Sequence, residues 1–399
     1  MKSVRGLIVA IAAVAAVAIS LPTPAGAFLL GEPTDGYKLK LGAESDIKLR
    51  VRLQPRLDFG DIRTNRAGTA YSSHDDFYSR RTRFETSGHI TEKLKFNVTF
   101  AADKWEKKSQ DEEIYLYYAY LDYKFSPALS IRFGKHKLPY SRVSRVSSSK
   151  QLLVERPAST EKAKKLFGNY HPYNQPALKV EGRAMHGLMG YALAVAEGWE
   201  DGETIRSGRS VDDADLLYAG RLELSPPGWV EGKNGKKGKK SDAHLGEGRH
   251  LTFGLSLASQ DSIEYRENGY EEDRELFGFD VSFHRGPFTL QFEYIRWEED
   301  SDDPAVDEKE PEGWYVQAGY FFERYALEPA VRYEVYDQDT DSSSMEEKTT
   351  TVGVNWYAKG HSVKLGMNWV HTSYDRNAGG RLARDDDRDV FQVQGQFYF

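Results

Sequence analysis

Apolar and polar residues alternate with a period of two along most of this 399-residue chain. In residues 47–53, IKLRVRL, the odd positions are apolar and the even positions are cationic. The same alternation occurs in residues 94–100, 277–284, 288–294 and 363–369. Alternation of this kind is typical of β-strands with one apolar and one polar face, and helical periodicity is nearly absent after the N-terminal segment. The sequence therefore predicts an all-β fold.

Segment length and connection length favour a membrane barrel over a soluble sandwich, whose strands would also alternate. The segments run 9–14 residues, which is long for soluble strands but suits tilted membrane strands. Aromatic residues lie near the ends of the apolar faces, as an interfacial girdle requires, and tight turns alternate with long polar loops. The predicted strands are 46–59, 75–88, 92–103, 113–125, 128–136, 176–184, 187–197, 214–225, 249–260, 273–284, 287–298, 312–322, 325–337, 348–358, 361–375 and 387–399. These sixteen segments predict a closed transmembrane antiparallel β-barrel that encloses water.

Two prolines and two charged runs qualify this picture. Pro55 and Pro329 lie inside predicted strands and cannot donate a ladder hydrogen bond, so we expect a bulge or strand shift at each. Turn order places the lysine-rich run 232–240 on the periplasmic side, as a solvated loop or as a contact for an acidic partner or a binding protein. It places the acidic run 298–303 in an extracellular loop, either solvated or bridged to lipopolysaccharide by divalent cations.

The cationic face of the first strand must line water. Lys48, Arg50, Arg52 and Arg56 share this face, and a cation facing lipid costs about 2–4 kcal/mol near the midplane. Four of them would rival the whole stability of a typical domain, about 5–15 kcal/mol. Further lumen candidates are Arg81, Arg83, Arg132, Lys179, Arg183 and Arg221, and later strands add Asp280, Glu293, Glu328 and Glu334 with Arg332 and Lys364. Either a basic half faces an acidic half and sets up a transverse field, or lumen salt bridges neutralise both.

The N-terminal segment predicts export. Lys2 and Arg5 precede an apolar run at 7–19, and Ala25-Gly26-Ala27 is a small-x-small cleavage site. We expect a signal peptide over residues 1–27, leaving 28–399 as the barrel. The alternative is an uncleaved anchor helix, for which the apolar run is short. The absence of cysteine excludes disulfides, thiolate nucleophiles, zinc fingers and Fe–S clusters, and the net charge of −7 argues against nucleic-acid binding.

Several stretches resemble the phosphate-selective porin O/P family. Residues 132–141, RFGKHKLPYS, with SSSK at 147–150 and LLVER at 152–156, are similar to the third-loop region of that family. Arg56-Leu57-Asp58 and Arg80-Arg81-Thr82-Arg83 are similar to its first two strands, and the C-terminal QGQFYF looks like the assembly signal of bacterial porins. The resemblance implies a homotrimer of sixteen-stranded barrels in the outer membrane. It also implies a third loop, here 137–175, that folds inward and narrows each pore.

The family's basic positions imply the site. The expected pore and anion-binding residues are Arg50, Arg52, Arg56, Arg80, Arg81, Arg83, Arg132, Lys137, Arg142, Arg145, Lys150 and Arg156. The third-loop match also covers Pro139, Tyr140, Ser141 and Ser148. This chain departs from the family in having Leu138-Pro139 where a double proline is common, and in the added run 161–165. Strict alternation would also place Arg80 and Arg81 on opposite faces, unless a bulge intervenes.

These observations predict an outer-membrane porin for passive diffusion of small hydrophilic solutes, leaning towards anions such as phosphate. Loop 137–175 is too long for an ordinary connection. Its cations either line the pore or lie outside and bind lipopolysaccharide phosphates. We expect outer-membrane lipid and lipopolysaccharide as surroundings, and no cofactor, metal site or catalytic residue. The alternatives are a scaffold or sheath for a partner protein, or a barrel hydrolase, although no H-E-x-x-H, G-x-S-x-G or P-loop motif is present.

Overall fold

The computed structural model of the protein describes residues 36–63, 71–107, 113–168, 174–205, 208–231, 244–341, 346–375 and 387–399. The expected signal peptide and the lysine-rich run 232–240 lie outside these residues.

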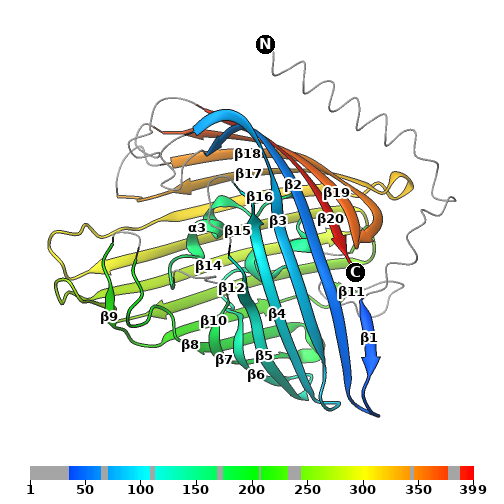
Figure 1. Ribbon diagram of the computed structural model, residues 1–399, viewed down its shortest axis with the longest axis horizontal. Coiled ribbons are helices and arrows are strands. Elements are labelled where there is room, and N and C mark those ends of the chain that lie inside the picture. Colours follow the sequence, from blue (N-terminus) through cyan, green and yellow to red (C-terminus); the bar gives the residue numbers. More distant parts are fainter. Residues whose placement is uncertain are drawn as a thin grey trace. The chain divides into compact units, whose positions relative to one another are not determined.

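Sixteen strands form one closed ring (Figure 1). They are β2 (Asp46–Arg63), β3 (Tyr71–His89), β4 (Leu94–Trp105), β5 (Tyr115–Ser126), β6 (Leu129–Lys137), β7 (Asn174–Ala184), β8 (Met189–Ala196), β10 (Leu217–Leu224), β12 (Arg249–Gln260), β14 (Glu272–Arg285), β15 (Phe288–Ser301), β16 (Glu312–Tyr320), β17 (Leu327–Asp337), β18 (Glu346–His361), β19 (Val363–Tyr374) and β20 (Arg388–Tyr398). Each strand pairs antiparallel with the next one. The predicted barrel and its sixteen strands are confirmed.

The seam between β20 and β2 closes the ring. Arg56 lies opposite Gln394 in this ladder. Val51 N–H donates to the Phe399 carbonyl at 2.7 Å, and Phe399 N–H donates back to the Val51 carbonyl at 3.1 Å. The short strand β1 (Tyr37–Lys40) pairs with the first residues of β2, beyond the end of β20. β1 and β20, from the two ends of the described chain, therefore pair with the same side of β2.

The remaining elements are short. β11 (Val230–Glu231) pairs with β12, and β9 (Val211–Asp213) pairs with β13 (Glu264–Tyr265) in a separate small sheet. The helical turns are α2 (Arg142–Arg145), η1 (Ser148–Lys150), α3 (Ala158–Ala163), η2 (Met185–Gly187) and η4 (Glu323–Tyr325). No helix in the described ranges is long and apolar enough to cross a bilayer.

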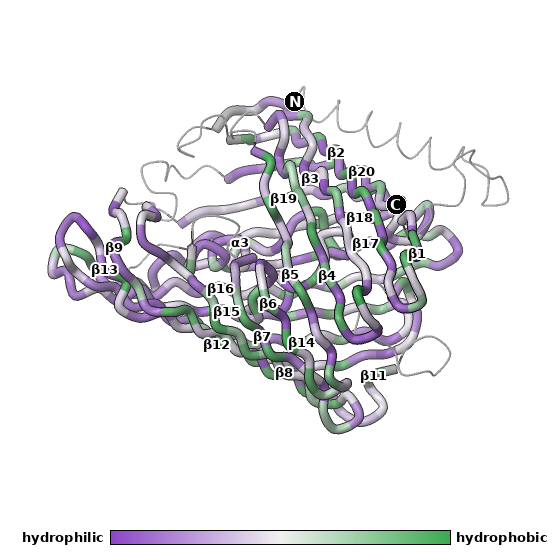
Figure 2. The backbone as a smooth tube through the Cα atoms, turned by 60° about the horizontal axis from the view of Figure 1, so that its bottom comes forward, coloured by the Kyte–Doolittle hydropathy of each residue, from purple (hydrophilic) through white to green (hydrophobic). Residues whose placement is uncertain are grey.

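The barrel is apolar outside and polar inside, the reverse of a soluble protein. Figure 2 shows hydrophobic and hydrophilic residues alternating along the strands. Phe77 and Phe133 on the outer face are 69% and 68% exposed, whereas Gln54 and Arg56 on the inner face are 0% and 3% exposed. Exposure of so large an apolar surface to water is unfavourable, so this outer face requires lipid.

The two prolines behave differently. At Pro55 the register with β3 shifts, because Gln54 lies opposite Arg81 while Pro55 lies opposite Ser79. The bulge expected there is confirmed. Pro329 lies opposite Val354 in regular register, so the bulge or shift expected at this position is wrong. The ladder of β17 with β16 ends at Ala330, and a missing N–H at Pro329 breaks no pairing on that side.

The acidic run at 298–303 is only partly a loop. Residues 298–301 form the end of β15, where Asp300 lies opposite Asp273 of β14. The strand therefore continues about three residues past its predicted end at 298, because a strand above the lipid boundary no longer needs an apolar face.

The connection between β6 and β7 turns into the barrel. We call its described part, residues 138–168, the inward loop; it carries α2, η1 and α3. In Figure 1, α3 lies within the ring of strands, and it contacts β15, β16 and β17. Tyr140 and Phe167 of the inward loop are fully buried and belong to one apolar cluster with Leu276, Ile295 and Trp297 of the wall. The lumen is thus partly filled from inside.

Candidate pore constriction

Polar side chains of β15, β17, β18 and β19 form hydrogen bonds with the inward loop. Ser141 Oγ and Arg142 N–H donate to Glu293 of β15 at 2.8 and 2.7 Å. Lys364 Nζ donates to the Gln151 carbonyl at 3.0 Å, and Asn355 Nδ2 donates to the Leu152 carbonyl at 2.6 Å. Arg332 Nη1 donates to the Glu155 carbonyl at 2.9 Å. The last three bonds satisfy loop carbonyls, and the first two satisfy a hydroxyl and an N–H of the loop, all of which would otherwise be buried without these partners.

Two glycines on β16 let the inward loop approach the wall. A Cβ at Gly313 would lie 2.5 Å from Ser159 Cβ, and a Cβ at Gly319 would lie 2.8 Å from Leu152 Cδ1. Both distances are too short for carbon atoms, so any larger residue would push the loop away from β16.

Six arginines on β2 and β3 form a second contact surface, which we call the arginine wall. Its members are Arg50, Arg52, Arg56, Arg80, Arg81 and Arg83. The bulge opposite Pro55 brings both Arg80 and Arg81 to the inner side, where they are 7% and 3% exposed. The doubt raised by strict alternation is thereby resolved.

Carboxylates neutralise the arginine wall. Arg52 pairs with Glu85 at 2.6 Å, and Arg56 pairs with Asp58 at 2.6 Å. Arg83 Nε donates to Asp103 Oδ1 at 3.2 Å, and Arg50 pairs with Glu85 at 3.2 Å.

Glu155 of the inward loop is the node of this surface. Arg80 Nη2 donates to Glu155 Oε2 at 3.1 Å, Arg56 Nη1 also donates to this carboxylate, and Arg81 Nη2 lies 3.6 Å from Oε2. Burial opposes the charge of Glu155, but Arg80, Arg56 and Arg81 outweigh burial and hold its pKa well below the usual value. The carboxylate therefore ties the loop to β2 and β3.

Other cations remain exposed to a cavity, which we call the basic chamber. The cavity has a volume of about 390 Å³ and lies between the inward loop and the barrel end with tight turns. Among the described residues, five cationic side chains line it: Arg142, Arg145, Lys150, Arg183 and Arg221. Two carboxylates, Glu223 and Asp280, line it as well.

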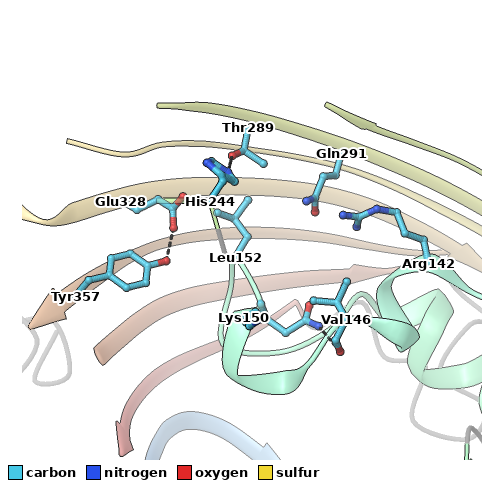
Figure 3. A pocket seen from close by; sticks show the side chains of 10 residues that line it. Arg142, Val146, Lys150, Leu152, His244, Thr289, Gln291, Glu328 and Tyr357 are labelled. Atoms are coloured by element: carbon cyan, nitrogen blue, oxygen red, sulfur yellow. Dashed lines mark hydrogen bonds between the residues drawn. The ribbon is translucent and has the colours of Figure 1, made fainter. Parts of the chain in front are cut away.

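The chamber cations are less neutralised than those of the arginine wall. Arg221 is tightly bound to Asp280 at 2.6 Å, but Arg145 lies 3.5 Å from Glu223 and Arg183 lies 3.9 Å from it. The Lys150 ammonium has no hydrogen-bond or ion-pair partner in the described part of the chain. Figure 3 shows Lys150 and Arg142 around a smaller pocket that adjoins this chamber.

Three of the expected site residues have other contacts. Arg132 Nε donates to Asp122 Oδ2 at 2.9 Å. Lys137 Nζ donates to the Ser144 carbonyl at 2.7 Å, and Arg156 Nη2 donates to the Val146 carbonyl at 3.1 Å. Lys137 and Arg156 thus brace the inward loop from within.

Charged side chains in the lumen pair with nearby residues of opposite charge at several places around the barrel. Lys179 pairs with Glu181, Arg221 with Asp280, and Arg332 with Glu334. Of the two arrangements left open by the sequence, this pattern favours mutual neutralisation over a transverse field between a basic and an acidic half.

No site role was predicted from the sequence for the histidines and threonines that line the chamber. His244, His250, His284, Thr252 and Thr289 line it. Alternation places His250 and His284 on the inner face, so their exposure to the lumen was detectable. His244 lies in a long connection without periodicity, and nothing in the sequence indicates its position.

A closed sixteen-strand barrel with a charged lumen and an inward loop has the architecture of an outer-membrane porin. The model of the family described as phosphate-selective porin O and P matches residues 49–399, and the chain belongs to this family. It is therefore a porin of the outer membrane and a channel rather than an enzyme, as predicted.

Related proteins agree with this assignment. An uncharacterized protein of Aquifex aeolicus is 37% identical over 386 residues, covering 88% of this chain and 87% of the relative. Porin O of Pseudomonas aeruginosa is 23% identical, covering 96% and 97%. Among solved structures, the anion-selective porin from Comamonas acidovorans has a TM-score of 0.62 at 13% identity, covering 89% of this chain and 100% of that chain. The outer-membrane channel DcaP of Acinetobacter baumannii has a TM-score of 0.61 at 11% identity, covering 91% and 99%. A trimer form of OmpT from Vibrio cholerae has a TM-score of 0.55 at 10% identity, covering 89% and 100%.

Proposed function

We propose that the protein is a homotrimeric diffusion channel that favours small anions, phosphate among them, and that the inward loop is its constriction. The observation that carries this proposal is the charge balance of the basic chamber, where five cations face two carboxylates among the described lining residues. Each cation at contact distance attracts a monovalent anion by about 1 kcal/mol in water-like surroundings. A small excess of such cations at a narrow point is enough to set selectivity.

The comparisons support this proposal. The family is described as phosphate-selective, and the structurally similar porin of Comamonas acidovorans is anion-selective. The OmpT trimer form supports a trimer. Export through a signal peptide at 1–27, and contact with outer-membrane lipid and lipopolysaccharide, belong to the same proposal because the apolar outer face of the barrel requires a bilayer.

The mechanism follows from the chamber geometry. An anion that reaches the inward loop exchanges part of its water for contacts with Arg142, Arg145 and Lys150, and then leaves down its gradient. Release is fast because these cations are partly exposed and offer several weak contacts in place of one tight site. The sheath alternative is disfavoured because the inward loop occupies the lumen that a partner protein would need.

Reversal potentials in planar bilayers test the proposal. We expect an anion-selective wild type, and an anion-to-cation permeability ratio that falls about tenfold in R142A/R145A/K150A at low salt. The matched control is K40A/K95A/K124A, which removes three exposed cations outside the chamber and should keep the ratio within about twofold. A cation-selective wild type, or equal ratios in the two triple variants, would overturn the anion proposal. Cross-linking in detergent tests the trimer separately.

A further inference from the structure

Three histidine rings are stacked in the basic chamber. His250 on β12 and His284 on β14 lie directly opposite each other in the ladder. Their ring centroids are 5.4 Å apart with an interplanar angle of 6°, and the ring centroid of His244 lies 4.0 Å from that of His284 with an interplanar angle of 5°. We call these residues the histidine stack. All three line the same cavity as Arg142, Arg145 and Lys150.

Hydrogen bonds engage both ring nitrogens of His244. Gly246 N–H donates to His244 Nδ1 at 3.2 Å, so this nitrogen acts as an acceptor. His244 Nε2 lies 2.7 Å from Thr289 Oγ1 and can donate its proton there; a dashed line marks this contact in Figure 3. An imidazole whose Nδ1 accepts a hydrogen bond must give up that bond to become charged. Protonation of His244 therefore breaks its hydrogen bond with Gly246.

The charges facing the stack oppose protonation in an empty chamber. The cationic groups are Arg142, Arg145 and Lys150 of the inward loop, Arg183 of β7 and Arg221 of β10. The acidic groups are Glu223 of β10, Asp280 of β14 and Glu328 of β17. Tyr357 and His361 of β18 also face the stack. Glu328 and Asp280 are themselves bound to Tyr357 and Arg221. Two stacked imidazolium ions would also repel each other. An oxyanion in the chamber would remove most of this repulsion.

We propose that the histidine stack and Lys150 form a proton-linked oxyanion site. Binding of a tetrahedral oxyanion favours uptake of a proton from solvent by the stack, and a charged stack in turn holds the oxyanion more tightly. Imidazole is the side chain whose charge changes between about pH 5 and 8, so the linkage falls in that range. This inference rests on the proposed anion channel and adds the residues that make its selectivity pH-dependent.

Sulfate is the right probe, because its charge stays constant between pH 5.5 and 8.0 while that of phosphate changes. We expect the sulfate concentration that half-blocks the chloride current through wild-type channels to be at least about fivefold lower at pH 5.5 than at pH 8.0, because one added charge attracts even a monovalent anion by about 1 kcal/mol at contact distance. The variant H244Q/H284Q should reduce this pH effect to less than about twofold. The control H89Q/H371Q removes two histidines that lie near Asp46 and Asp389 rather than in the chamber, and it should behave as wild type.

A measurement on the wild type keeps the proposal testable if the variant does not fold. Sulfate binding followed by calorimetry in two buffers of different ionisation enthalpy should show net proton uptake at pH 6.5. No uptake, or a pH effect in H244Q/H284Q equal to that of wild type, would overturn the proton-linked site. The R142A/R145A/K150A result at pH 8.0 would still decide the anion channel itself, so the two failures are distinguishable.

Discussion

The arginine wall and the basic chamber hold similar numbers of cations inside one barrel, yet they differ in what those cations do. In the wall, Glu85, Asp58, Asp103 and Glu155 lie against the guanidinium groups at ion-pair distances. In the chamber, Arg145 lies 3.5 Å from Glu223 and 3.9 Å from Glu181, and Arg183 lies 3.9 Å from Glu223. Lys150 has no carboxylate partner among the described residues. An anion site is therefore defined by the imbalance of charge and by exposure, and a high count of arginines does not reveal it.

The largest expected effect comes from removing the node of the wall. The substitution Glu155→Gln leaves Arg56, Arg80 and Arg81 without their shared carboxylate, and we expect a loss of about 3 kcal/mol in unfolding free energy. It should also raise the anion-to-cation permeability ratio, because it turns neutralised arginines into available ones. Urea unfolding followed by tryptophan fluorescence and bilayer reversal potentials measure the two effects.

The matched control for this variant is Glu161→Gln, another carboxylate of the inward loop, whose partner Lys164 is three residues away. We expect it to cost clearly less than Glu155→Gln, since this pair is local and partly exposed. Equal losses in the two variants would mean that the wall is not tied together by Glu155.

Raising the ionic strength should weaken the effect of the chamber cations on selectivity more than the effect of the arginine wall on stability. The Debye length is about 10 Å at 0.1 M salt and about 3 Å at 1 M, and partly exposed charges are screened far more than buried pairs. The difference in permeability ratio between wild type and R142A/R145A/K150A should shrink at 1 M salt. The stability difference between wild type and Glu155→Gln should persist there. A selectivity difference that does not change with salt would place the selecting cations in a buried site.

The smallest effect concerns acid. Burial disfavours the charge of Glu161, but Lys164 and Arg156 outweigh it and lower its pKa to about 2, and the pKa of Glu155 is held well below its usual value. A lowered folded pKa stabilises the protein above the ordinary carboxyl pKa of about 4.3, and this stabilisation is lost as the pH falls towards the folded value. The melting temperature of the wild type should therefore fall as the pH is lowered from about 4.3 to about 2. The variant E155Q/E161Q should lose less stability over this interval, and parallel curves would contradict the assignment.

The barrel was predictable because each strand must place apolar residues towards lipid and polar residues towards water, and this alternation is visible in the sequence. A single cation facing lipid costs enough to fix which face of β2 points inward, and each neighbouring strand follows the same rule. Pro55 showed where alternation breaks, and the resulting bulge explains how Arg80 and Arg81 both point inward. Pro329 gave the same signal without a bulge, because its effect depends on where the neighbouring strand ends.

The partners of the cations were not predictable. Alternation states that Arg56 faces the lumen, but its partner Glu155 lies 99 residues away in a loop without periodicity. Only the folded loop decides that Glu155 neutralises the wall while Lys150 is left facing the chamber. The apolar cluster around Tyr140 and Trp297 was missed for the same reason, since the inward loop creates apolar surroundings inside a lumen expected to be wet.

The seam between β2 and β20 has a consequence for biogenesis. Residues more than 330 positions apart must meet there, as Arg56 and Gln394 do, so the joint forms from the most distant contacts in the chain and is expected to form late. Until then, both strands present unpaired edges, which attract other β-structure. A chain that ends before β20 would leave this edge of β2 open, and in the described part of the chain β1 covers only its first four residues. The unpaired edges of β2 and β20 would therefore distinguish an unclosed barrel from a finished one, and a quality-control protease or chaperone could recognise them.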